Sequence, residues 1–170
     1  MQLIKCTIGV VMMGSSYAIA NPSVDIVNSC YQRGAVSNGI KKVDIEGTFV
    51  DKPSAGCEDQ LEANFEGETY GAATCNDNQY LIVANKMFLA SQAINLSIDK
   101  RIRPGDDFSA TRSVWLAFSK GNESYVCMLR TAFEMGKGRG YAAFYLMKHR
   151  PAPAKPEVYF YFLDKVDWSK

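Results

Sequence analysis

Apolar and polar residues alternate in three stretches of the chain, and this period of two predicts strands with one buried side. The three stretches are residues 40–50, 60–66 and 94–98. The apolar positions expected to face the interior in the first two are Val43, Ile45, Phe49, Leu61, Ala63 and Phe65. Runs of β-branched and aromatic residues predict three further strands, over residues 113–118, 141–147 and 158–163.

Apolar residues at helical spacing predict two capped helices. Ser23 is a suitable N-cap for the first helix, and Gly34 is expected to end it. Asn122 is the expected cap of the second helix, and Gly136 is its expected end. Each helix gathers its apolar residues on one face, so both are expected to pack against a sheet.

Residues 76–98 fit two structures. A helix over about residues 78–90 is the first choice, because apolar residues there lie along one stripe. A buried strand over residues 80–83 is the alternative. The preceding residues 67–73 are expected to form a loop. Prolines after residue 150 exclude a helix before the last strand.

The first twenty residues differ from the rest of the chain. Lys5 is their only charge, an apolar run follows, and Ala18-Ile19-Ala20 matches the small-residue pattern of a cleavage site. A membrane span needs about 20 apolar residues, roughly twice the run found here. The pattern therefore predicts a signal peptide over residues 1–20, a single globular domain over residues 21–170, and a periplasmic or secreted protein.

Charge balance narrows the possible partners. The chain has 19 basic and 18 acidic residues, so removal of Lys5 with the leader leaves 18 of each. A neutral domain argues against nucleic acid as a partner, since such binding calls for a basic face. Neutrality also gives no long-range attraction to anionic membranes, and no later stretch is apolar enough to form a stable anchor.

Five cysteines become four once Cys6 is removed with the leader. An even set in an exported chain predicts two disulfides, and four cysteines allow three pairings among which the sequence alone does not choose. The preferred pairing is Cys57–Cys75 with Cys30–Cys127. A zinc site is disfavoured because the chain has no C-x-x-C pair and a single histidine. We expect no metal and no other cofactor.

These elements define a strand-rich α+β class. The expected architecture is a curved antiparallel sheet, or a small OB-like barrel, of about five or six strands packed against one or two helices. The order of strands, disulfide, helix and strands is similar to that of the B subunits of bacterial AB5 toxins. This resemblance rests on element order over about half of the chain, and it implies a receptor-binding role.

Candidate catalytic groups are few. His149 is the only histidine, and it lies between Lys148 and Arg150, so we expect an exposed loop side chain with no carboxylate to orient it. The remaining route to catalysis is a pair of carboxylates facing each other across a cleft. The adjacent pairs Glu58-Asp59 and Asp106-Asp107 lie in expected turns, where neighbouring side chains diverge. The sequence therefore favours a non-enzymatic protein.

Aromatic rings gather in the last third of the chain. Because alternate residues of a strand point to opposite faces, Phe144, Phe160 and Phe162 are expected in the core. Three tyrosines would then lie outside, beside cations. This expected binding set contains Tyr145, Tyr159, Tyr161, Lys148, Arg150 and Lys155. Exposed tyrosines beside cations suit recognition of a protein or a glycan, whereas the alternative is an ordinary sheet whose outer face a helix covers.

The glycine-rich stretch over residues 136–140 adds Lys137 and Arg139 to the candidate binding residues. Its backbone amides and two cations could hold an anion, whereas a helix end followed by a hairpin turn is the alternative.

The resulting hypothesis is an exported, non-enzymatic binding protein for a protein or a glycan. An inhibitor, an immunity protein or a toxin-type receptor-binding subunit would fit. An exported hydrolase or toxin that uses carboxylates on glycans or the cell wall is the alternative, and a structural subunit of a surface assembly is a third hypothesis.

Overall fold

The computed structural model describes residues 21–51, 53–106, 113–133 and 139–167, with side chains described outside residues 131–141 and 164–167. One α-helix, one 3-10 helix and eleven strands occur within these ranges. In chain order they are α1 (Val24–Gln32), β1 (Ile40–Asp44), β2 (Thr48–Phe49), β3 (Cys57–Phe65), β4 (Glu68–Cys75), β5 (Asn78–Val83), β6 (Lys86–Leu89), η1 (Ala90–Gln92), β7 (Ile94–Asn95), β8 (Ser113–Lys120), β9 (Glu123–Phe133), β10 (Arg139–Arg150) and β11 (Val158–Asp167).

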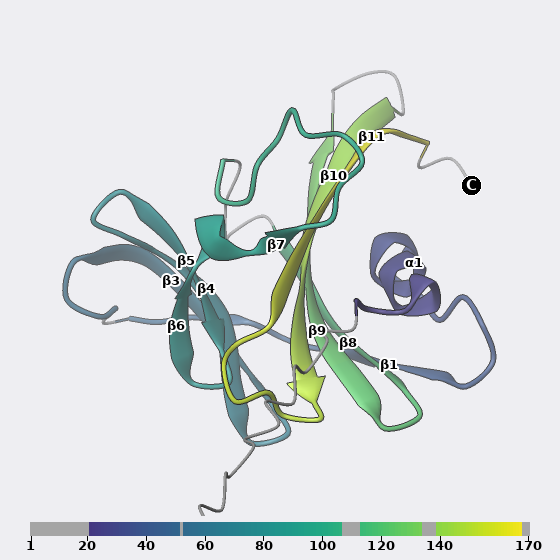
Figure 1. The fold of residues 1–170 in the computed structure, drawn as a ribbon. Helices are drawn as coiled ribbons and strands as arrows, with labels where there is room; N and C mark the ends of the chain where they lie inside the picture. Colours follow the sequence, from purple (N-terminus) through teal and green to yellow (C-terminus); the bar gives the residue numbers. More distant parts are fainter. Residues whose placement is uncertain (1–20, 52, 107–112, 134–138, 168–170) are drawn as a thin grey trace, which may run out of the picture.

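The strands form two sheets (Figure 1). Sheet A has the order β1-β8-β9-β10-β11-β7, and sheet B has the order β2-β3-β4-β5-β6. Neighbouring strands are antiparallel except β7, which runs parallel to β11. Each order runs between two end strands, so neither sheet closes within the described residues. The α+β prediction is confirmed, whereas the barrel variant of it is wrong.

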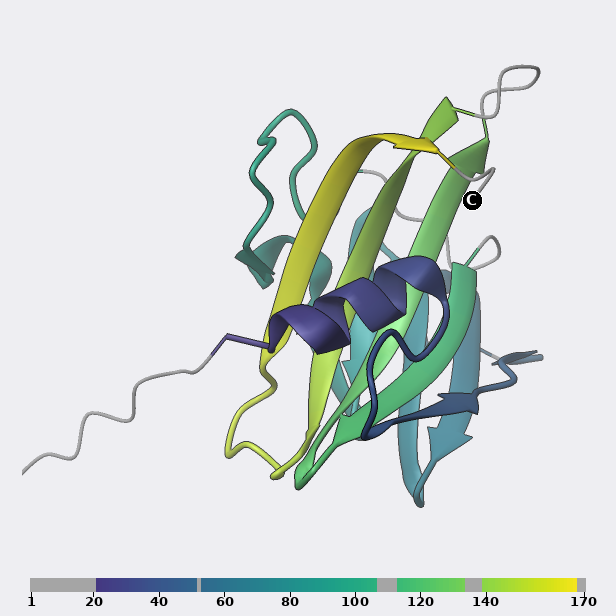
Figure 2. The ribbon, with the colours of Figure 1, turned by 90° about the vertical axis from the view of Figure 1, so that its right-hand side faces the viewer.

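Sheet A lies between two apolar layers. One layer packs it against sheet B, in a buried cluster that contains Leu81 and Tyr70 of sheet B together with Trp115 and Phe160 of sheet A. The other layer packs its opposite face against α1, through Ile26 and neighbouring buried residues. Figure 2 shows α1 lying across this face of sheet A. The described elements are therefore arranged as helix, sheet and sheet.

The helix follows its sequence signals closely. Ser23 occupies the N-cap position, although its side chain makes no capping hydrogen bond. Arg33 adopts a left-handed φ of 55°, and the Gly34 N–H donates to the Ser29 carbonyl at 3.0 Å, which satisfies a carbonyl of the last turn. The predicted helix and its end are confirmed.

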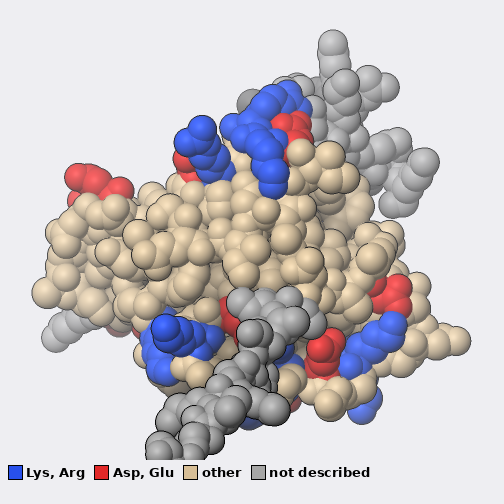
Figure 3. Space-filling model, in the orientation of Figure 1, with Lys and Arg blue, Asp and Glu red and all other residues tan. Residues whose placement is uncertain are grey.

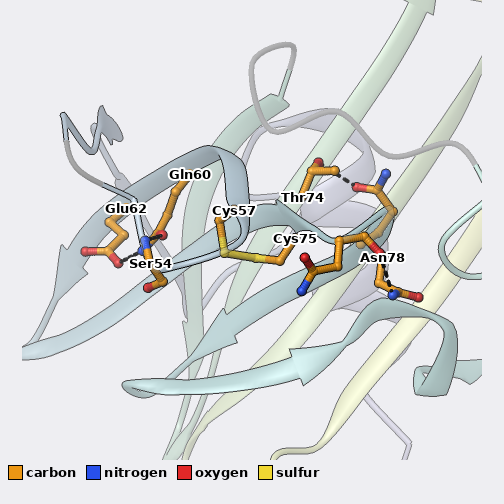
Figure 4. The surroundings of a disulfide bond; sticks show 9 residues. Ser54, Cys57, Gln60, Glu62, Thr74, Cys75 and Asn78 are labelled. Atoms are coloured by element: carbon orange, nitrogen blue, oxygen red, sulfur yellow. Dashed lines mark hydrogen bonds between the residues drawn. A yellow bond between two sulfur atoms is a disulfide. The ribbon is translucent and has the colours of Figure 1, made fainter.

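Both preferred disulfides are present. Cys30–Cys127 ties α1 to β9 across 97 residues. Cys57–Cys75 joins β3 to β4 across 18 residues, near the hydrogen bond from the Ser54 N–H to the Gln60 side chain at 2.9 Å (Figure 4). The predicted pairing is therefore confirmed.

The expected helix over residues 78–90 is wrong, and the strand alternative over residues 80–83 is correct. Ala84 and Asn85 have φ values of 48° and 66°, as a two-residue hairpin turn requires, and they join β5 to β6. The expected loop over residues 67–73 is also wrong, because residues 68–73 belong to β4 and only Gly67 lies in the turn before it.

The expected helix from Asn122 to Gly136 is wrong because β9 covers Glu123–Phe133. Val126 and Met128 face the layer between the sheets, while Cys127 and Leu129 face α1. A strand buried on both faces is apolar almost throughout, so its sequence also satisfies a helical stripe.

Residues 40–50 do not form one strand. Their first half joins sheet A as β1 and their second half joins sheet B as β2. Ile45, between the two, packs against the inter-sheet layer as expected. Val43 and Phe49 are instead 49% and 58% exposed, so their predicted inward orientation is wrong. The third alternating stretch contributes only the short strand β7.

Candidate functional site

The predicted tyrosine surface does not exist in the described structure. Tyr145 is 4% exposed and Tyr159 is fully buried. Tyr145 lies opposite Phe160 and therefore shares its face, toward sheet B. Tyr159 points to the other face, where α1 covers it. The expectation of exposed rings is wrong because both faces of sheet A are covered.

Tyr161 is half-buried and stacks on Phe144 with ring centroids 5.0 Å apart. Burial raises the pKa of Tyr161 to about 12. Burial, and then the charge of Glu157, also raises the pKa of Tyr159, whose hydroxyl donates to Glu157 Oε2 at 3.1 Å. Both pKa values rise because burial disfavours the charged phenolate, so neither ring behaves as a solvated surface tyrosine.

The expectation of an exposed His149 without a carboxylate is also wrong. Its side chain is fully buried at the end of β10. Nε2 lies 2.8 Å from Glu66 Oε2, and Nδ1 lies 2.8 Å from the Tyr70 hydroxyl and 3.1 Å from Glu68 Oε2. The Phe65 ring meets the imidazole edge-on at 4.9 Å. This His149 cluster ties the β3–β4 hairpin to the end of β10.

The His149 cluster suits a structural role better than proton transfer to a substrate. Both ring nitrogens already have partners, and the side chain has no exposed area. Burial, followed by the charge of Glu68, raises the pKa of Tyr70, so this phenol stays neutral. Sequence reasoning missed Glu66, Glu68 and Tyr70 because they lie far from the histidine in the chain. Tyr70 precedes His149 by 79 residues and Glu66 precedes it by 83. The Glu66-Gly67 turn was the one available signal of a hairpin there.

A groove lies immediately beyond the His149 cluster. Its cavity has a volume of about 810 Å³. We call it the proline groove, and its lining consists of Phe88, Gln92, Ile94, Lys148 and residues 151–158. A smaller cavity of about 260 Å³ shares part of that lining and extends it toward Val83, Ala84, Lys86, Glu68 and His149.

Two kinds of wall form the proline groove. Phe88 of β6 and Ile94 of β7 line one side, so the groove lies where the two sheets end. The loop with Pro151, Pro153 and Pro156 lines the other. Because proline fixes φ, this wall loses little conformational entropy when a ligand binds. The loop is also tied at its base.

Lys148 and Glu157 hold the base of the loop through two interactions. The Lys148 N–H donates to the Glu157 carbonyl at 3.0 Å, and the two side chains form an ion pair at 3.2 Å. Glu157 also accepts from Tyr159, so its charge is neutralised within the protein. Lys155 and Lys86 are exposed, and neither side chain has a hydrogen-bonding or ionic partner among the described residues.

Of the predicted binding cations, the structure brings Lys148 and Lys155 together in the proline groove. Arg150 is half-exposed and lies outside the groove lining, with Nε 3.9 Å from Glu66 Oε2. Lys137 and the side chain of Arg139 lie outside the described residues, so the anion site predicted for residues 136–140 stays a prediction.

The carboxylate pairs do not converge in the described structure. Glu58 and Asp59 are exposed on β3. Asp106 accepts a hydrogen bond from the Arg103 N–H at 3.0 Å within its own turn, and Asp107 lies outside the described residues. Neither Glu58 nor Asp59 lines a cavity described above. The two acids that do are Glu157, which is paired with Lys148, and Glu68, which contacts His149 and Tyr70.

Figure 3 shows how charge is distributed on the face that carries β6 and β7. The middle of this face is free of charged side chains, and basic and acidic groups lie toward its margins. Ile94, which lines the proline groove, is 38% exposed and adds to the apolar surface there. No helix among the described residues has both the length and the apolar character needed to cross a membrane.

Comparisons of the chain with protein-family models, with curated proteins and with solved structures found no match.

Proposed function

We propose that this chain is an exported, non-enzymatic binding protein that holds a segment of another protein in the proline groove. The observation that carries the proposal is the groove itself. It is concave, its walls are mainly apolar, and its volume of about 810 Å³ lies within the usual range for binding sites. Two disulfides support an oxidising compartment outside the cytosol. An inhibitor or immunity protein would work in this way.

The groove lining favours a polypeptide over a glycan. Glycan recognition uses exposed rings that stack on sugars beside several polar groups. Phe88 is the one aromatic residue in the described lining, and alanine and proline supply most of the opposite wall. Such walls match the apolar side chains of a protein segment.

The alternative of a carboxylate-dependent hydrolase has less support. Glu157 and Glu68, the acids of the two cavities, are held by Lys148 and His149 respectively. A general acid or base needs a group that can reach the substrate. The described groove presents free cations rather than free carboxylates.

Affinity capture with a blocked variant tests the proposal. Ala152 is exposed and lines both cavities, so Ala152→Trp fills the groove without entering the core. Ala35, exposed in the connection after α1, provides the matched control Ala35→Trp. The disulfide-bonded chain, its variant and its control are immobilised and exposed to exported proteins, and bound proteins are identified by mass spectrometry.

The expected result is a protein that the native chain and Ala35→Trp capture and Ala152→Trp loses. Titration of that purified protein against all three forms should repeat the difference. Identical capture by all three forms would overturn the groove as the binding site. Loss of the bound protein after enzymatic removal of its glycans would overturn recognition of a polypeptide segment.

A further inference from the structure

We propose that the segment bound in the proline groove is extended and acidic, and that it lies along the free edge of β6 with carboxylates against Lys86 and Lys155. This inference rests on the proposed function and adds the chemistry of the partner. It is carried by the unbalanced charge of the groove and by the position of β6 at the end of sheet B.

The charges of the groove do not cancel. Glu157 pairs with Lys148 and accepts from Tyr159. Glu68, at the other end, is held by His149 and Tyr70. Both acids are therefore occupied by groups of the protein itself.

Two cations are left. The side chains of Lys86 and Lys155 are exposed and make no hydrogen bond or ion pair with any described residue. The rest of the lining is apolar except for Gln92, the Lys148–Glu157 ion pair, and Glu68 and His149, which contact each other. Complementary charge in a partner both speeds association and selects against basic competitors. The groove thus favours a segment that carries carboxylates beside apolar side chains.

The shape of the site favours an extended segment. Ala84, Lys86 and Phe88 alternate along the β5–β6 hairpin. Phe88 lines the proline groove, and Ala84 and Lys86 line the neighbouring smaller cavity. The cavities therefore follow β6 along its length. Alternate side chains of an extended segment could occupy this path, since a strand points every second residue to the same side.

The backbone of β6 adds a second attachment. The two-residue turn pairs Val83 with Lys86, and this register directs the N–H and carbonyl of Met87 away from β5. Because β6 ends sheet B, no described strand lies on that side. An extended segment can hydrogen-bond to such an edge, which is a common mode of peptide recognition.

Selection from a displayed library of random linear dodecapeptides tests the inference. The baits are the disulfide-bonded chain, the charge-reversed double variant Lys86→Glu/Lys155→Glu, the matched control Lys41→Glu on the exposed edge strand β1, and Ala152→Trp. Circular dichroism confirms that each bait is folded. We expect the native chain and Lys41→Glu to enrich peptides rich in Asp and Glu among apolar residues.

Charge reversal should enrich peptides rich in Lys and Arg instead, and Ala152→Trp should enrich neither set. An enriched acidic peptide should bind the charge-reversed variant about tenfold more weakly, measured by fluorescence anisotropy. In the same assay Met87→Pro, which removes the outward N–H, should weaken binding while Met87→Ala retains it.

The outcomes separate the two proposals. If the native chain selects peptides without acidic bias, or if the charge-reversed bait selects the same peptides, the proposal of an acidic segment is overturned. Loss of binding on Ala152→Trp would in that case still support the groove as the binding site. Equal binding by Met87→Pro and Met87→Ala would overturn pairing with β6. Enrichment unaffected by Ala152→Trp, or no enrichment on the native chain, would overturn the inference together with the groove as a peptide site.

Discussion

The Tyr70 hydroxyl lies 2.8 Å from Nδ1 of His149, and this contact joins β4 of sheet B to β10 of sheet A. Both residues are almost completely buried, with exposures of 0% and 1%. The His149 cluster therefore connects the two sheets beside the proline groove. Because His149 lines the smaller cavity as well, a loss of this connection would also disturb the proposed binding site.

Replacing His149 should destabilise the protein. His149→Ala leaves Tyr70 and Glu68 without their shared partner and opens a cavity, so we expect the free energy of unfolding to fall by about 2–4 kcal/mol. Urea denaturation measures this change. The control is Arg150→Ala, which removes a half-exposed side chain whose Nε lies 3.9 Å from Glu66 and should cost about 0.5 kcal/mol or less. Equal losses for the two variants would show that the cluster adds no stability.

The two disulfides should contribute unequally to stability. In the chain-entropy model a bridge stabilises by restricting the unfolded chain, and longer loops give more. Cys30–Cys127 spans 97 residues and Cys57–Cys75 spans 18. Replacing the first pair by alanine should cost about 4–5 kcal/mol, and replacing the second about 3 kcal/mol. Thermal unfolding of both double variants tests the order, and a larger loss for Cys57→Ala/Cys75→Ala would contradict it.

Alkaline pH should destabilise the protein through tyrosines that folding withdraws from solvent, as the half-buried Tyr161 illustrates. The pKa of Tyr161 rises from 10.0 to about 12 on folding because burial disfavours the phenolate. Below pH 10.0 both states keep the proton and this contribution is complete. Between there and pH 12 the unfolded chain loses protons that the native state retains, so stability falls as pH rises. Denaturation midpoints measured across this range should decrease less in Tyr161→Phe, and an identical pH dependence would contradict the assignment.

Local sequence signals predicted the elements that have one buried side or a capped end. Leu61 and Phe65 alternate with polar residues because only one face of β3 meets the core. Helix α1 begins and ends near its predicted signals for the same reason: the chemistry of its ends is local. The sequence also favoured the correct cysteine pairing. Cys57 and Cys75 close a short polar loop, and pairing them leaves Cys30 to pair with Cys127.

Two of the errors share one physical origin. Strand β9 is covered by α1 on one face and by sheet B on the other, so Val126, Cys127 and Met128 are all buried and no alternation remains. The same two-sided burial placed Tyr159 inside rather than outside. Whether a second layer covers a strand depends on contacts between distant segments, and an isolated stretch of sequence does not contain that information.

The candidate site was predicted only in part. Lys148 and Lys155 were expected beside the binding surface, and both line the proline groove. Their expected companions were tyrosines, whereas the structure supplies Phe88 and Ile94 from segments more than 50 residues earlier in the chain. The groove is therefore a product of how the edges of two sheets meet, which no local pattern shows.

Close packing of β4 against β3 leads to a final prediction. A Cβ on Gly71 would meet the Leu61 carbonyl oxygen, with the Glu62 Cα at 3.2 Å. Both obstacles are backbone atoms of the neighbouring strand, so they cannot move aside without separating the two strands. Gly71→Ala should therefore lower the free energy of unfolding by at least about 2 kcal/mol.

The matched control for that substitution is Gly34→Ala after α1, where the nearest atom to an added Cβ is the Gln32 carbonyl oxygen at 3.8 Å. It should change stability by no more than about 0.5 kcal/mol. Urea denaturation of the two variants gives the comparison. If the Gly71→Ala protein were as stable as the Gly34→Ala protein, β3 and β4 would be farther apart at Gly71, which pairs with Glu62, than the structure places them.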